Sequence, residues 1–155
     1  MRGKAFAANF QSVGTLEDAP YLCVQAALDW RRRSRWEGKH GEEAVVAYLH
    51  NLASEGGRRV AQILGTEILV SSPCAITNVR LPLFGKFQVD DVAACVMRRM
   101  MEEHQIAVVV SLYKKAWWVR LCAQIYLTLE NFERAARLLR ELCEKLVEEQ
   151  GRAGS

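Results

Sequence analysis

The sequence lacks the short motifs that mark most metal, phosphate and hydrolase sites. Its five cysteines contain no Cys-x-x-Cys pair, and none of its three histidines lies four residues from another, so the spacing of a zinc site is missing. It has no glycine-rich phosphate loop and no Gly-x-Ser-x-Gly motif. These absences exclude the most easily recognised classes of metalloenzyme, nucleotide-binding protein and serine hydrolase.

The sequence also has little excess charge and no long apolar run. Lys and Arg number 21 against 18 Asp and Glu, and the net charge of +3 is too small to indicate a nucleic acid or a membrane surface by itself. No apolar run approaches the roughly 20 residues of a membrane-spanning helix, and no signal-peptide-like segment follows Met1–Lys4. Because 50% of the residues are hydrophobic, we expect a soluble, cytoplasmic protein with a real core and reduced cysteines.

Apolar residues at steps of three and four predict helices along much of the chain. The first covers about 21–33, and a longer one covers 42–65, where the final glycine supplies a stop. Within the longer helix, Gly56-Gly57 predicts close packing against another backbone. Two further helices are predicted from Asp90 and Asn131, each of which is placed to cap its helix.

Runs rich in β-branched residues predict strands in the second half of the chain. The predicted strands are 67–70, 75–83, 106–110 and 117–127. From residue 67 onward the order is therefore strand, strand, helix, strand, strand, helix. This order predicts an α+β domain with a three- to four-stranded antiparallel or mixed sheet and helices on one face.

Arg120 is the residue that carries the clearest sign of a binding site. The alternation within the last predicted strand points Val119 and Leu121 to the core, and Arg120 and Cys122 to the opposite face. A guanidinium in an otherwise apolar strand needs an anion, and its planar fork suits a bidentate carboxylate or phosphate. From the pattern alone, a salt bridge to a neighbouring Asp or Glu is the alternative.

The run Arg31–Arg35 combines four arginines with the aromatic residues Trp30 and Trp36. Such a run could bind RNA or DNA. The alternative is a solvated connection after a helix C-terminus, where cations complement the helix dipole. The alternative is the simpler explanation, so we expect no nucleic-acid partner.

Several segments in a fixed order resemble the class V aminotransferase family. They are Phe10–Thr15, Tyr21–Leu28, Glu55–Gly65, Asn78–Leu83 and Val119–Tyr126. The fungal isopenicillin-N-epimerase-like and cysteine-desulfurase-like members are the most similar branch. The resemblance covers nearly the whole chain.

This resemblance implies a fold-type-I pyridoxal-phosphate (PLP) enzyme that works as a homodimer on an amino acid, as a lyase, desulfurase, epimerase or aminotransferase. It implies that Gly14 and Thr15 contact the cofactor phosphate of the neighbouring subunit, and that Arg120 holds the substrate α-carboxylate. It also implies that 1–65 are the end of the large PLP domain with its long connecting helices, 66–150 the C-terminal small domain and 151–155 a frayed tail. Cys122 stands where such proteins usually have serine.

The lysine that joins PLP in such enzymes lies upstream of the Gly-Thr pair, and only Lys4 precedes Gly14 here. The surroundings of Lys4 do not resemble the lysine motif. We therefore expect no catalytic residue in this chain, no activity by the chain alone, and a truncated or partial gene product. The competing hypothesis is a non-enzymatic α+β interaction module that binds a partner through exposed apolar surface.

Overall fold

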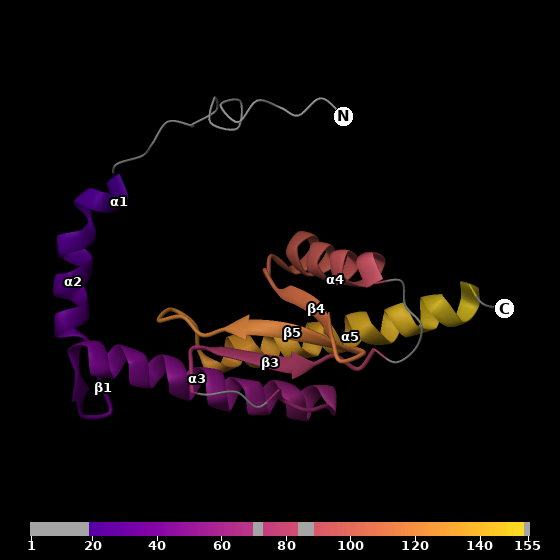
Figure 1. Cartoon of the computed structure of the whole chain (residues 1–155), viewed down its shortest axis with the longest axis horizontal. Helices are drawn as coiled ribbons and strands as arrows, with labels where there is room; N and C mark the ends of the chain where they lie inside the picture. Colours follow the sequence, from indigo (N-terminus) through magenta and orange to yellow (C-terminus); the bar gives the residue numbers. More distant parts are fainter. Residues whose placement is uncertain (1–18, 70–72, 84–88, 154–155) are drawn as a thin grey trace.

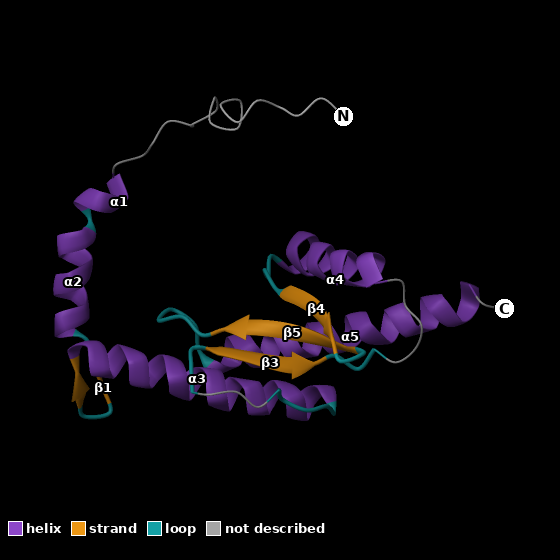
Figure 2. Cartoon of the chain, in the orientation of Figure 1, coloured by secondary structure: helices purple, strands orange, loops and turns teal. Residues whose placement is uncertain are grey.

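The computed structural model describes residues 19–69, 73–83 and 89–153, which form five helices and two antiparallel sheets (Figures 1 and 2). In chain order, the elements are α1 (Ala19–Leu22), α2 (Val24–Arg33), β1 (Arg35–Trp36), β2 (Lys39–His40), α3 (Gly41–Leu64), β3 (Ile76–Arg80), α4 (Val89–His104), β4 (Val109–Tyr113), β5 (Ala116–Cys122) and α5 (Leu129–Ala153). None of these helices is long and apolar enough to cross a bilayer.

The larger sheet has three strands in the order β3-β5-β4, and both pairings are antiparallel. Strands β4 and β5 form a hairpin whose turn residues, Lys114 and Lys115, have φ of 47° and 61°. Positive φ at both central positions matches the twist of the flanking strands. The turn fixes the register, so that Val119 lies opposite Val110 on one side and Val79 on the other.

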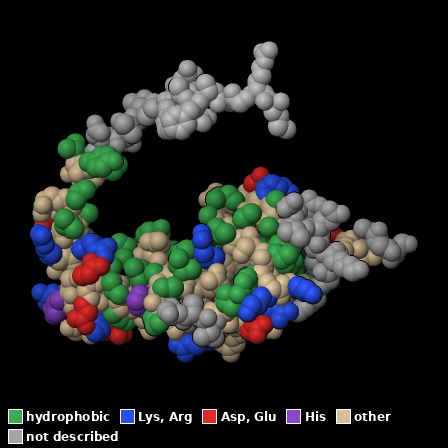
Figure 3. Space-filling model, in the orientation of Figure 1, with side chains coloured by type: hydrophobic (Ala, Val, Ile, Leu, Met, Phe, Trp, Pro, Cys, Tyr) green, Lys and Arg blue, Asp and Glu red, His purple; other side chains and the backbone are tan. Residues whose placement is uncertain are grey.

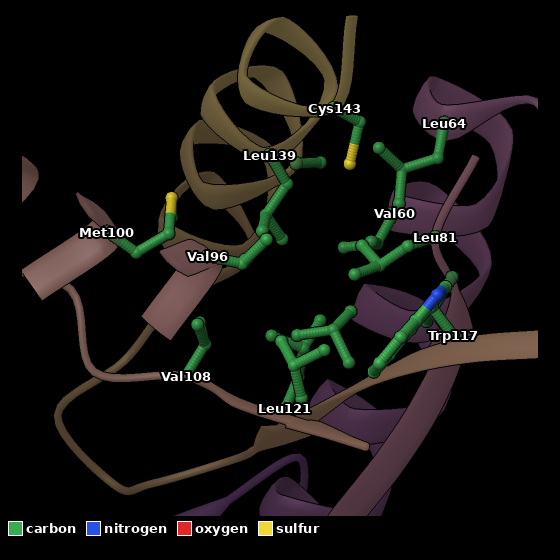
Figure 4. Close-up of a cluster of buried hydrophobic side chains, with 14 of the residues drawn as sticks. Val60, Leu64, Leu81, Val96, Met100, Val108, Trp117, Leu121, Leu139 and Cys143 are labelled. Carbon is green, nitrogen blue, oxygen red and sulfur yellow. The ribbon is translucent and has the colours of Figure 1, made fainter. Parts of the chain in front are cut away.

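One face of this sheet is covered by helices. Helix α3 packs against α5 and β3, while α4 packs against β4 and α5. Side chains from all three helices meet the inward side chains of the strands in a single core (Figure 4). Its largest fully buried side chains are Val60, Val79, Leu81, Val96, Met100, Val119, Leu139 and Cys143. The predicted α+β class, with helices on one face of a small sheet, is confirmed.

Helix α3 keeps two glycines in its middle because neighbouring side chains occupy the space beside them. A methyl group added at Gly56 would overlap the ring of Phe132, and one added at Gly57 would overlap the hydroxyl of Thr77. The prediction of close packing is confirmed, but the neighbours are side chains and not another backbone. The helix ends at Gly65, whose φ of 65° gives the left-handed cap expected of that residue.

The predicted strands differ from the observed ones in position. Residues 67–69 contribute only an isolated bridge between Ile68 and Val79, so no separate strand forms among the described residues of 67–70. Strand β4 begins at Val109, three residues later than predicted, because the Lys114-Lys115 turn pairs Tyr113 with Ala116. Strand β5 ends at Cys122, well before the predicted end.

The segment predicted as an irregular connection contains a short hairpin of β1 and β2. Its turn residues, Glu37 and Gly38, both have positive φ, which is typical of a two-residue hairpin turn. The Arg31 guanidinium bonds the carboxylate of Glu42, with Nε 2.7 Å from Oε2, and this bond lowers the pKa of Glu42. The hairpin and this ion pair together connect α2 to the start of α3.

Helix α5 begins two residues earlier than its predicted cap. Thr128 precedes the first helical residue, and the Asn131 side chain reaches back, its Oδ1 accepting a hydrogen bond from the Thr128 backbone N–H at 2.8 Å. This is the reciprocal part of a capping box, so Asn131 supports the cap without being the cap. The inward face of α5 follows the spacing of its apolar residues, since Phe132, Ala135, Leu139, Leu142 and Leu146 are all buried.

Helices α1 and α2 form an arm that projects from the start of α3 (Figure 1). Neither helix has a buried residue. The single helix predicted over about 21–33 is observed as two helices, α1 and α2, which are separated at Cys23. The domain boundary at 65/66 stays a prediction. In the structure α3 shares its core with the sheet, and α5 continues to Ala153.

Candidate functional site

The uncovered face of the three-stranded sheet carries Arg120 at its centre. Strand β5 is the middle strand, and Arg120 lies opposite Asn78 of β3 and Val109 of β4. The predicted alternation is confirmed here, because Val119 and Leu121 are buried while Arg120 and Cys122 are exposed. The Arg120 side chain therefore lies on the face of the sheet opposite the core.

Trp118 is the exception on this face. The alternation placed it on the exposed side with Arg120, yet it is buried, and its indole N–H donates to the Tyr113 carbonyl at 3.1 Å. The indole thus packs along the β4–β5 hairpin and fills one end of the face. This packing leaves the end near Arg120 and Cys122 as the accessible part.

A cavity of about 550 Å³ lies beside Arg120, and we call it the Arg120 cavity. It is bounded by the segment 105–109, by the end of β5 with the residues after it, and by the first turns of α5. Its polar lining residues are Gln105, Arg120, Cys122, Gln124, Tyr126, Asn131 and Arg134. Among the described residues, two arginines and no Asp or Glu line the cavity, so it favours an anion.

Arg120 has no acidic partner among the described residues, and neither does Arg134. Other arginines are paired: Arg80, on the same sheet face, lies 2.9 Å from Glu67, and Arg59 lies 3.1 Å from Glu133. The alternative explanation of Arg120, a structural salt bridge, is therefore not realised in the described chain. Its fork of donors is available to a ligand.

Figure 3 shows the side of the molecule between the arm and α4. Hydrophobic side chains gather there with a basic group among them. The exposed apolar residues of the uncovered sheet face include Ile76, Val109 and Tyr113, which are 39–46% exposed. A ligand or a further polypeptide on this surface would bury these apolar side chains, which favours its binding.

Of the predicted site residues, the structure places only Arg120. Gly14 and Thr15 lie outside the described residues. Arg134 was not predicted, because it belongs to the charged outer side of an amphipathic helix, where arginines are common. Its position in the sequence could have indicated it, because Arg134 lies in the second turn of α5, the helix that follows the strand of Arg120. Within the described ranges no three His, Cys, Asp or Glu residues gather as a metal site.

Comparisons with known proteins give a similarity along nearly the whole chain. No family model matches the sequence. The L-cysteine desulfhydrase-like protein lolT2 of Epichloe uncinata is 32% identical over 92% of this chain, and lolT1 of the same organism is 29% identical over the same share. The aligned part is 36% of the first relative and 37% of the second. The chain thus spans little more than a third of the length of the curated relatives it matches.

Proposed function

We propose that this chain is the small-domain region of a PLP-dependent, class V aminotransferase-like enzyme that cleaves or transfers a group of an amino acid such as L-cysteine. The observation that carries the proposal is Arg120, an exposed arginine that has no acidic partner among the described residues and lies in a cavity that none of their acidic side chains lines. The similarity to proteins named L-cysteine desulfhydrase-like supports a thiol amino acid as the substrate. The family resemblance of the motifs supports PLP as the cofactor.

In this proposal Arg120 holds the α-carboxylate of the substrate. Its two parallel N–H donors bind both carboxylate oxygens, which fixes the plane of the carboxylate as well as its position. Arg134 adds a second positive charge to the lining of the same cavity, and no acidic side chain of the described residues lines it to compete for either guanidinium. Fixing one end of the substrate orients its α-carbon toward the cofactor.

PLP, when bound, supplies an electron sink for the negative charge that develops at the α-carbon. The described donors around Arg120 suit a substrate carboxylate, and the proposed contacts to the cofactor phosphate are Gly14 and Thr15. Since no lysine of this chain resembles the Schiff-base lysine, we propose that the chain alone is inactive. We place the protein in the cytoplasm, where PLP and free amino acids are available.

The Arg120→Gln substitution is expected to weaken carboxylate binding by roughly tenfold or more, because a charged bidentate pair contributes about 1.5–3 kcal/mol. S-methyl-L-cysteine is a suitable ligand, since it keeps the carboxylate and cannot form disulfides. Arginine side-chain N–H signals followed by NMR during a titration would report binding at Arg120 itself. Arg120→Lys should weaken binding less, because it keeps the charge and loses the fork.

Arg140→Gln is the matched control. This substitution also removes one positive charge, but it does so on α5, where Arg140 lies beside Glu144 and outside the Arg120 cavity. S-methyl-L-cysteine amide, which lacks the carboxylate, should bind no tighter to the wild-type chain than S-methyl-L-cysteine binds to Arg120→Gln. Equal affinities of wild-type and Arg120→Gln chains for S-methyl-L-cysteine would contradict the assignment.

A second candidate function, a non-enzymatic interaction module, is favoured by the α1–α2 arm. Tyr21, Leu22 and Val24 are 76%, 83% and 51% exposed, although such side chains normally lie in cores or interfaces. We propose a second copy of the chain as the occupant of this surface. Light scattering after gel filtration should then give twice the chain mass, and Leu22→Lys with Val24→Lys should give the monomer mass. A wild-type monomer at high micromolar concentration would remove this candidate.

A further inference from the structure

A second pocket lies where the arm meets the body, and we call it the aromatic pocket. Trp30 of α2, Trp36 of β1 and Tyr48 of α3 supply its rings, and its volume is about 330 Å³. This volume is at the lower end of the range for small-molecule sites, which is about 300–1,000 Å³. The pocket therefore fits a compact ligand of one or two rings.

The aromatic wall of this pocket is held in place by specific contacts. The rings of Trp36 and Tyr48 pack edge to face, with centroids 5.7 Å apart and planes at 77°. The Tyr48 hydroxyl donates to the Leu127 carbonyl at 2.5 Å, which ties the ring to the chain after β5. Ala44, Val45 and Ile125 complete the apolar lining. A flat apolar ring can pack against such a wall without rearranging it.

Two arginines, Arg33 and Arg35, also line the aromatic pocket, and no acidic side chain does so within the described ranges. The Arg33 Nε–H donates to the Asp29 carbonyl at 3.2 Å, and neither arginine has an acidic partner among the described residues. The other two arginines of the run do have acidic partners. Arg32 lies 2.9 Å from Asp29, and Arg31 is bonded to Glu42. Of the four arginines in this run, Arg31 and Arg32 form ion pairs, whereas Arg33 and Arg35 line the pocket.

This division argues against an extended nucleic-acid surface. A strand of nucleic acid requires a continuous row of available cations along its backbone. Here the available positive charge is confined to one small concave site beside three aromatic rings. Such a site matches a single anionic group attached to a single flat ring system.

From these contacts we infer that the aromatic pocket is a binding site for a small aromatic anion, in which the ring packs on Trp30 and Trp36 and the anionic group bonds Arg33 and Arg35. The anion can be a carboxylate or a phosphate, because a guanidinium pairs with either. The site is separate from the Arg120 cavity, with which it shares no lining residue. The inference therefore does not depend on the proposed PLP enzyme.

An NMR titration of the full chain tests this site directly. Trp30 and Trp36 line the pocket, whereas Trp117 and Trp118 are buried in and along the sheet. With 2-naphthoate, the indole N–H signals of Trp30 and Trp36 should move and those of Trp117 and Trp118 should stay. Trp30→Phe and Trp36→Phe assign the signals. Neutral 2-naphthalenemethanol should bind at least tenfold more weakly than 2-naphthoate.

Substitutions distinguish the contribution of Arg33 and Arg35, which line the pocket, from that of Arg32, which is paired with Asp29. Arg33→Gln with Arg35→Gln should weaken 2-naphthoate binding by at least tenfold, and Arg32→Gln should change it less than twofold. Adenosine 5′-monophosphate compared with adenosine asks whether the natural anion is a phosphate. A larger gain in affinity from adenosine to its monophosphate than from 2-naphthalenemethanol to 2-naphthoate would support a phosphate ligand, and the reverse order a carboxylate.

Three outcomes would overturn the inference. One is no movement of the Trp30 and Trp36 signals with any of the anions at millimolar concentration. Another is equal binding of 2-naphthoate and its neutral alcohol. The third is equal loss of affinity in Arg32→Gln and in the Arg33 and Arg35 double variant, since a general charge effect would explain that result.

Discussion

Phe132→Ala is expected to lower the free energy of unfolding by about 3–5 kcal/mol, as is usual when a buried aromatic ring is removed. Phe132 is only 4% exposed and fills the space beside Gly56, where it joins α5 to α3. Gly56→Ala alone should cost about 1–3 kcal/mol, because its methyl group would overlap the ring. Unfolding in guanidinium chloride measures both.

The two changes should not be additive. In the Phe132→Ala background the added methyl group at position 56 has room, so Gly56→Ala should cost little or should stabilise the helix by up to about 1 kcal/mol. Gly151→Ala is the control, because nothing lies within 4 Å of a methyl group there. Additive losses in the double variant would show that the overlap between Gly56 and Phe132 does not limit packing.

The stability of the protein is expected to fall steeply above pH 9 because of Cys143. This thiol is 1% exposed, and burial raises its pKa from the ordinary 9.0 to about 12, with a smaller contribution from Glu144. Below pH 9 the thiol is protonated in the folded and the unfolded chain. Between pH 9 and 12 the unfolded chain loses the proton and the folded chain keeps it. The free energy of unfolding therefore falls by about 1.4 kcal/mol for each pH unit in this range.

The comparison with Cys143→Ala isolates this effect from other groups that titrate in alkali. The wild-type chain should be more stable than the variant at pH 8, and the difference should shrink by roughly 1 kcal/mol per pH unit above pH 9. A constant difference between wild type and Cys143→Ala from pH 8 to 11 would contradict the prediction.

Helical elements were predicted well because their signals are local. The buried stripe of α5 and the long α3 follow from apolar spacing, and Gly65 ends α3 as its flexibility predicts. Strand positions depend on pairing, which a run of β-branched residues does not reveal. The start of β4 at Val109 is set by a turn of two lysines, a pair that does not carry the usual Asn-Gly signature.

Part of the candidate site could be predicted as well, because its signal is also local. Alternation along one strand was enough to place Arg120 on the face opposite the core. Whether an acid would neutralise Arg120 depends on side chains from other elements, and only the fold places these. The same limit applies to the arginines beside Trp30 and Trp36, because Arg31 and Arg32 have acidic partners, while Arg33 and Arg35 have none in the part of the chain that the structure describes.

The strand order β3-β5-β4 also constrains the sequence of events during synthesis. The two outer strands do not pair with each other, and each depends on β5, which leaves the ribosome last of the three. Until residues 116–122 have emerged, β3 and β4 have no partner and α3 has no sheet to cover. The nascent chain must therefore carry the apolar side chains of α3 and β3 exposed until β5 appears, a period in which chaperones can bind it.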